Sequence, residues 1–139
     1  MEAVCRAFCE TPGRQGLVLG VLPAAADDPR CSPPPGYPNP WVELAVQTHL
    51  PLSGPRGLEA LSRNHINVLT CDVLVALAGG EGTLSELLLA VRYGRPVVAF
   101  LDSPQELPRL PSEVPWSAAL ADVQRFVQEH LPEPFHSAG

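Results

Sequence analysis

The segment from residue 73 to residue 101 constrains the fold most. Two apolar runs of strand length, Val73 to Ala78 and Val97 to Leu101, flank a stretch with helical periodicity from Thr83 to Tyr93. Continuous apolar runs are typical of strands that are covered on both faces of a parallel sheet. A strand, a helix and a second strand in this order predict parallel pairing through a right-handed crossover. We therefore expect an α/β fold.

The rest of the chain extends this alternation. The apolar spacing predicts further helices at residues 1–10, 56–69 and 117–131, and further strands at residues 17–22 and 42–46. The strand at 17–22 is expected to be central in the sheet. Residues 23–40 are rich in Pro and Gly and predict a long loop at the carboxyl end of that strand, where ligands bind. We expect one Rossmann-like domain over residues 1–131, a parallel sheet flanked by helices, and a tail over 132–139.

Composition limits the classes of function. The net charge of −6 argues against nucleic acid as a partner, because that polymer normally needs a basic face. The chain contains no lysine, which excludes a pyridoxal-phosphate enzyme and a P-loop NTPase of the usual pattern. No apolar run approaches the roughly 20 residues that cross a bilayer, and no targeting segment is evident. A cytoplasmic protein without a membrane partner is predicted.

The cysteines and histidines predict neither a metal site nor a disulfide framework. The four cysteines form no CxxC pairs, and the four histidines lie far apart without ligand spacing. Cys5 and Cys9 share a helix face, but small buried thiols are commoner there than metal ligands. We expect no required cofactor.

The loop Gly79-Gly80-Glu81-Gly82-Thr83 carries the strongest functional signal. It comes directly after a buried strand and opens a helix, so free backbone N–H groups and the positive end of the helix dipole converge on one spot. Glycines let a phosphate approach the backbone, and Thr83 can offer its hydroxyl. The alternative is structural: Thr83-Leu84-Ser85-Glu86 also matches a capping box, in which Thr83 and Glu86 only tie the helix start.

The pattern GGxGTxxE at residues 79–86 resembles the signature of the Lonely-Guy family and its relatives, a group long mislabelled lysine decarboxylases. With Ser62-Arg63-Asn64-His65-Ile66-Asn67-Val68, the chain looks closest to the branch of molybdenum-cofactor carrier proteins. The resemblance extends to about residue 105. It implies a Rossmann-type nucleotide-binding fold and a homo-oligomer, a dimer or larger, because the relatives dimerise through helices beside the site.

The resemblance also implies roles for single residues. In phosphoribohydrolase members, an Arg before the motif strand and the Glu of the motif serve catalysis, and they map to Arg63 and Glu86. Glu86 would assist chemistry at the ribose anomeric carbon while Arg63 steadies phosphate. Arg63 as a packing residue and Glu86 as a cap are the structural alternatives. The expected phosphate ligands are Gly79, Gly80, Glu81, Gly82, Thr83 and Asn64.

Two departures from the family pattern are visible. The hydrolases usually have Pro before Gly-Gly, where this chain has Ala78. Family members also begin with a strand, a helix, a second strand and a Gly-rich turn, and residues 1–6 resemble the segment immediately after that turn. The first strand-helix-strand unit is therefore expected to be missing, which would expose a sheet edge.

The sequence supports three hypotheses about function. The leading one is a binding protein for a phosphate-bearing, nucleotide-like ligand, such as a nucleotide or a molybdopterin-type compound, and hence a molybdenum-cofactor carrier. The second is hydrolysis of the N-glycosidic bond of a nucleoside 5′-monophosphate. The third is an oligomeric scaffold with a degenerate site.

Overall fold

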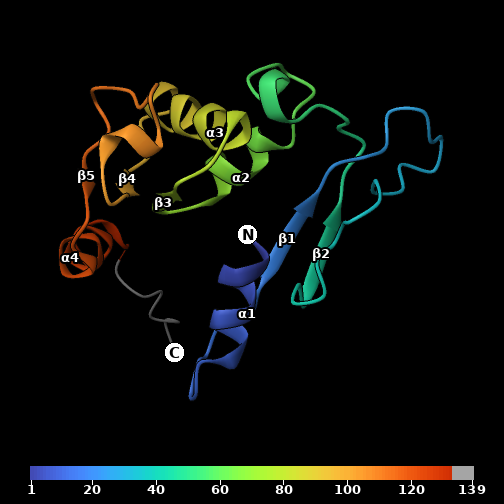
Figure 1. The fold of residues 1–139 in the computed structure, drawn as a ribbon. Coiled ribbons are helices and arrows are strands. Elements are labelled where there is room, and N and C mark those ends of the chain that lie inside the picture. The colour runs from blue at the N-terminus through green and yellow to red at the C-terminus, as the bar shows by residue number, and fades with distance from the viewer. Residues whose placement is uncertain (133–139) are drawn as a thin grey trace, which may run out of the picture. The chain divides into compact units, whose positions relative to one another are not determined.

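The computed structural model describes residues 1–132, so most of the predicted tail at 132–139 lies outside the described residues. The chain groups into two compact units. Residues 1–53 and 59–63 form the first unit, and residues 54–58 with the chain from residue 64 onwards form the second. Figure 1 shows the elements of both units, and each unit is described by itself.

The first unit contains one helix and a small parallel sheet. Helix α1 (Glu2–Glu10) precedes strands β1 (Leu19–Leu22) and β2 (Leu44–Gln47), which pair with Leu19 opposite Leu44. The predicted helix, both strands and the loop at residues 23–40 are confirmed. The prediction that β1 is central is wrong, because β2 is its only strand partner among the described residues. An apolar run shows that a strand can be buried, but it does not show how many strands pair with it. Leu19 in β1 is 54% exposed.

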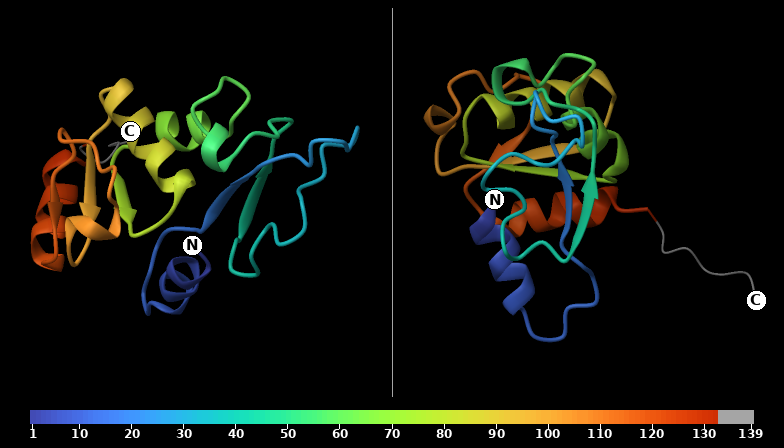
Figure 2. Two further views of the ribbon diagram at one scale, coloured as in Figure 1. Left: turned by 45° about the horizontal axis from the view of Figure 1, so that its top comes forward. Right: turned by 90° about the vertical axis from the view of Figure 1, so that its right-hand side faces the viewer.

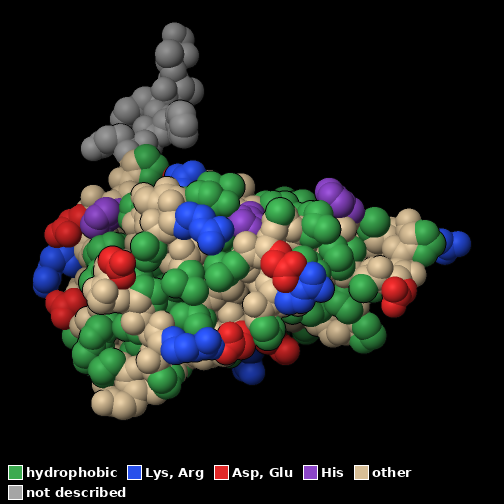
Figure 3. Space-filling view, turned by 90° about the horizontal axis from the view of Figure 1, so that it is seen from above, with side chains coloured by type: hydrophobic (Ala, Val, Ile, Leu, Met, Phe, Trp, Pro, Cys, Tyr) green, Lys and Arg blue, Asp and Glu red, His purple; other side chains and the backbone are tan. Residues whose placement is uncertain are grey.

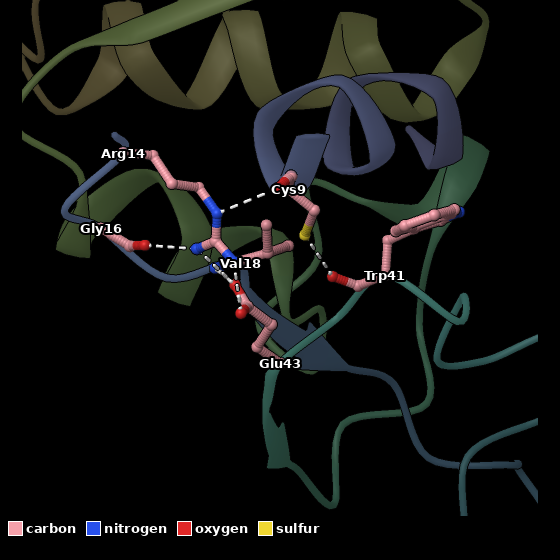
Figure 4. Close-up of polar contacts among 6 residues, drawn as sticks. All are labelled: Cys9, Arg14, Gly16, Val18, Trp41 and Glu43. Carbon is pink, nitrogen blue, oxygen red and sulfur yellow. Dashed lines mark hydrogen bonds and ion pairs between the residues drawn. The ribbon is translucent and has the colours of Figure 1, made fainter. Parts of the chain in front are cut away.

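A cluster of polar contacts ties the elements of the first unit together (Figure 4). Two nitrogens of Arg14 donate to the two carboxylate oxygens of Glu43, at 2.9 and 2.7 Å, and the backbone N–H of Val18 also donates to this carboxylate, at 2.9 Å. Arg14 further donates to the carbonyl oxygen of Cys9 at 3.3 Å. Glu43 thus joins the end of α1, the connection to β1 and the residues just before β2.

These contacts change the protonation of the groups involved. The hydrogen bonds from Arg14 and then Val18 lower the pKa of the Glu43 carboxyl, and the carboxylate in turn raises the pKa of Arg14. Burial, followed by the charge of Glu43, raises the pKa of the Cys9 thiol. At neutral pH the cluster therefore contains an ionised acid, an ionised base and a protonated thiol.

We expect Glu43→Gln to make the stability of the protein less sensitive to acid. A carboxyl whose pKa is lowered by folding stabilises the protein fully above its ordinary pKa of about 4.3, and this contribution is lost as the pH falls through the lowered value. Thermal melts from neutral pH down to about pH 2 should show a larger loss for the wild type than for Glu43→Gln. Glu10→Gln, which removes an exposed ion pair with Arg6, is the control. Identical pH profiles for wild type and Glu43→Gln would contradict the expectation.

The second unit contains a three-stranded parallel sheet. Strands β3 (Leu74–Leu77), β4 (Val97–Phe100) and β5 (Trp116–Ser117) lie in the order β3-β4-β5. Leu74 lies opposite Val97, and Ala99 lies opposite Trp116. Helix α3 (Glu81–Arg92) connects β3 to β4, so the predicted strand-helix-strand unit and the α/β class are confirmed. The parallel strands are divided between two sheets, whereas the sequence predicts one sheet.

Helices cover both faces of this sheet. Helices α2 (Asn64–Thr70) and α3 pack together on one face, and α4 (Leu120–His130) packs against β4 and β5 on the other (Figure 2). The core of this unit is formed by buried residues. Those that are at most 3% exposed are Val68, Leu87, Leu89, Ala90, Ala99, Leu101, Leu107 and Val114. This packing fixes β3 and α3, the two elements that flank the glycine loop.

The helices predicted at residues 56–69 and 117–131 differ from the observed ones. The helix expected over 56–69 is reduced to a 3₁₀ turn, η1 (Gly54–Arg56), and the short α2 (Asn64–Thr70). Ser62 instead forms an isolated parallel bridge with Leu52. The helix expected from residue 117 begins at Leu120, since Ser117 pairs with β4 as part of the unpredicted strand β5. None of the helices within residues 1–132 combines the length and the apolar character that a membrane crossing requires.

Candidate functional site

The glycine loop lies between the end of β3 at Leu77 and the start of α3 at Glu81. Gly80 is the N-cap, and the first backbone hydrogen bond of the helix runs from the Leu84 N–H to the Gly80 carbonyl oxygen, at 3.1 Å. The N–H groups of the first residues of a helix have no acceptor within it, and they carry the positive end of the helix dipole. The backbone at Glu81, Gly82 and Thr83 therefore presents donors that suit an anion.

The capping-box hypothesis is wrong. Helix α3 begins two residues before the predicted start, so Thr83 is its third residue, and no side chain caps the helix. Glu86 does not turn back to the helix start: its Oε1 accepts a hydrogen bond from Asn67 Nδ2 at 2.9 Å. Gly80 takes the cap position with non-helical backbone angles, and Glu81 in the first turn complements the dipole. The motif thus leaves Glu86 available for another role.

The three glycines of the loop differ in what requires them. A Cβ at Gly79 would lie 2.2 Å from the Thr83 hydroxyl oxygen, so packing requires glycine there. At Gly80 and Gly82 a Cβ would meet nothing within 4 Å, and neither residue has a positive φ. Packing among the described residues therefore explains neither glycine. The N-cap position itself favours glycine at Gly80, whereas Gly82 lies inside the helix, where glycine is disfavoured. A ligand could therefore approach the backbone of Gly80 and Gly82 without meeting a neighbouring side chain.

A buried polar cluster is hydrogen-bonded to the first turn of α3. The Asn64 and Ser85 side chains are 3% and 4% exposed, and Asn64 Nδ2 donates to Ser85 Oγ at 3.1 Å. Ser85 Oγ also lies 2.8 Å and 2.9 Å from the carbonyl oxygens of Glu81 and Gly82. These contacts hold the loop in position before any ligand arrives. The amide of Asn64 is buried against Ser85. The role of Asn64 as a ligand contact stays a prediction.

The two predicted catalytic residues are positioned by different elements. Arg63 belongs to the first unit, where its guanidinium carbon lies 5.8 Å from the centre of the Tyr37 ring, within the range of a cation–π contact. The Nε of Arg63 is buried without a hydrogen-bond partner among the described residues. Glu86 belongs to α3 in the second unit and is half-buried beside Asn67 on α2. Their catalytic roles stay predictions.

A pocket of about 250 Å³ opens beside the glycine loop. The segments that follow β3 and β4 line this pocket. Both lie at the carboxyl ends of their strands, where ligands bind in parallel sheets. Within it, the guanidinium of Arg109 pairs with the carboxylate of Glu81. The lining residues are Gly79, Gly80, Glu81, Leu84, Leu107, Pro108 and Arg109.

Sequence reasoning missed Arg109 and Asn67. Arg109 lies in a Pro-rich connection that predicts only a loop, 28 residues from Glu81. Asn67 is 19 residues from Glu86, and only the packing of α2 against α3 brings the two together. Residues so far apart in the chain form no local sequence pattern that would predict their contact.

The remaining candidates for a site are weaker. A depression of about 450 Å³ is lined by one face of α1 alone, so no second element contributes converging groups. Within residues 1–132, no three His, Cys, Asp or Glu side chains are grouped in a way that could hold a metal ion. On the face drawn in Figure 3, basic side chains are scattered among acidic and apolar ones and form no extended basic patch.

Comparisons with known proteins place the chain in a family. The model of the SLOG cluster4 family matches residues 1–125, which include the first unit, most of the second and the glycine loop. Curated proteins and solved structures gave no match. The SLOG superfamily includes Lonely-Guy-like proteins, so the predicted resemblance is confirmed at the level of the superfamily, and the specific branch stays a prediction. The match covers most of the chain, and the protein belongs to the SLOG cluster4 family.

Proposed function

We propose that the protein binds a phosphate-bearing, nucleotide-like ligand at the loop formed by Gly79 to Thr83. Membership of the SLOG family suggests a nucleotide-related role as a binding protein or an enzyme. The observation that carries the proposal is the open space at Gly80 and Gly82, where a Cβ would meet nothing within 4 Å. A phosphate against the backbone N–H groups is a physical reason for glycine at both positions.

Energetic reasoning supports this interpretation of Gly82. Glycine within a helix costs about 1 kcal/mol relative to alanine, and no neighbouring atom among the described residues compensates for that cost at Gly82. The buried cluster of Asn64 and Ser85 fixes the first turn, so the N–H groups need no reorganisation when an anion binds. The pocket of about 250 Å³ beside the loop is slightly smaller than typical ligand sites and has room for a phosphate group.

The finer proposal is a carrier for a nucleotide or a molybdopterin-type compound. It depends on the resemblance of residues 62–68 and 79–86 to the molybdenum-cofactor carrier branch. No chemical step is required of the protein in this role, and release of an unchanged ligand completes its cycle. Homo-oligomer formation and a cytoplasmic location accompany this proposal as predictions.

One observation favours a second function, a phosphoribohydrolase that acts on nucleoside 5′-monophosphates. The Glu86 carboxylate is not used as a helix cap, and Asn67 orients it through a hydrogen bond of 2.9 Å. A carboxylate held in this way can assist chemistry at the anomeric carbon, where the bond between ribose and base breaks and water adds.

Calorimetric titration with AMP, adenosine and inorganic phosphate tests the proposal. We expect AMP to bind with inorganic phosphate as its competitor, and adenosine to bind much more weakly, because the loop N–H groups and the helix dipole recognise the anion. Equal affinity for AMP and adenosine would contradict phosphate recognition. Chromatography of the same AMP samples measures free adenine. Release that is lost in Glu86→Gln would favour the hydrolase, and its absence across several monophosphates would favour the carrier.

A further inference from the structure

The Glu81–Arg109 ion pair lies where the proposed phosphate would enter. Both side chains line the pocket beside the glycine loop, and their charged groups pair within it. The pair is well exposed, with 64% of the Arg109 side chain and 46% of the Glu81 side chain accessible to solvent. It is therefore not part of the core that stabilises the second unit.

The Glu81 carboxylate resembles the proposed ligand in its chemistry. It is an anion in the first turn of α3, close to the positive end of the helix dipole, and it already contacts a guanidinium. A phosphate group carries more charge and more acceptor oxygens than a carboxylate, and a guanidinium can bind it through two parallel hydrogen bonds, whereas one contact joins Arg109 to Glu81. Glu81 and a bound phosphate would thus compete for the same cation.

We propose that Glu81 and Arg109 form a displaceable latch, in which an incoming phosphate replaces the Glu81 carboxylate as the partner of Arg109. The inference deepens the proposed function and rests on it, since it assigns Arg109 as a side-chain ligand of the phosphate. Displacement costs little, because exposed ion pairs contribute little to stability. The free carboxylate becomes hydrated, and no covalent bond changes.

The latch makes Glu81 an internal competitor, which gives the two residues opposite effects on affinity. Removing the carboxylate in Glu81→Gln should tighten binding of AMP and of inorganic phosphate by about two- to fivefold, the equivalent of the small energy of an exposed pair. Arg109→Gln should weaken binding of both by roughly fivefold, because a charge-assisted contact to the phosphate is lost. Both changes should disappear for adenosine, which carries no phosphate.

The double variant Glu81→Gln/Arg109→Gln separates a latch from a general effect of charge. If Glu81 acts by competing for Arg109, its removal gains nothing once Arg109 is absent, and the double variant should bind like Arg109→Gln alone. Glu113→Gln removes one negative charge from the same Pro-rich connection, outside the residues that line the pocket, and measures the general effect. Calorimetric titration at one fixed salt concentration gives all the affinities.

The outcomes separate the latch from the proposed function. A gain from Glu81→Gln that persists without Arg109, or that Glu113→Gln reproduces, would overturn the latch while phosphate binding stands. Unchanged affinity in Arg109→Gln would overturn it as well. Failure of the wild type and of all variants to bind AMP or inorganic phosphate would overturn both the latch and the proposed function.

Discussion

Replacement of Gly57 by alanine is expected to destabilise the second unit by about 3 kcal/mol. A Cβ at this position would lie 2.2 Å from Ser85 Oγ, 2.5 Å from Asn64 Nδ2 and 2.7 Å from Ser85 Cβ. Real Cβ atoms do not approach other atoms so closely, so one of the partners has to move. Asn64 and Ser85 are both nearly fully buried and hydrogen-bonded to each other, so movement would break polar contacts inside the protein.

Thermal or chemical denaturation measures the effect of Gly57→Ala, and Gly82→Ala is the matched control. The control makes the same chemical change where a Cβ meets nothing within 4 Å, so it should leave stability unchanged or raise it by up to about 1 kcal/mol. Because Ser85 also contacts the first turn of α3, Gly57→Ala should weaken AMP binding together with folding. Equal melting temperatures for Gly57→Ala and the wild type would contradict the tight packing of this cluster.

Gly82→Val is expected to lower the affinity for AMP more than tenfold, with a change in stability of no more than about 1 kcal/mol. The valine side chain enters space that the described residues leave empty, and φ at this position is not positive, so the folded state is not strained. The same side chain would stand in front of the N–H groups proposed to hold the phosphate. In this variant the affinity for AMP should therefore fall while the free energy of unfolding changes little.

Titration calorimetry beside thermal melts resolves the two effects of Gly82→Val. Gly82→Ala should give an intermediate affinity, because a methyl group obstructs the approach less than a branched side chain does. Thr83→Ala is a further comparison: Thr83 is the third residue of α3 and does not cap it, so no capping energy is lost. If Gly82→Val lost stability while its affinity for AMP stayed unchanged, the loop would have a structural role and phosphate binding there would be contradicted.

The elements whose signals are local could be predicted from the sequence. The apolar runs identify β3 and β4, the intervening periodicity identifies α3, and the composition of the glycine loop identifies the turn between β3 and α3. The predicted start of α3 is two residues too late, because Thr83 and Glu86 match a capping box while the cap is Gly80. The two-residue strand β5 is too short for any periodicity to indicate it.

Contacts between distant segments were not predictable from the sequence. The pairs Arg14–Glu43, Asn67–Glu86 and Glu81–Arg109 are separated by 29, 19 and 28 residues, and each forms only because packing brings two elements together. The close packing of Gly57 on Ser85 is likewise a contact between segments far apart in the sequence. The loop chemistry of the site could therefore be predicted, but its supporting and competing side chains could not.

The use of backbone N–H groups as anion donors affects how the protein would behave in a mixture of anions. The N–H groups at the start of α3 offer the same donors to any small anion, whatever is attached to it. On the proposed function, free phosphate and sulfate occupy the same donors as any nucleotide, and mass action lowers the apparent affinity for the nucleotide as their concentration rises. The fraction of protein carrying a nucleotide is then set by the ratio of nucleotide to inorganic anion, not by the nucleotide concentration alone.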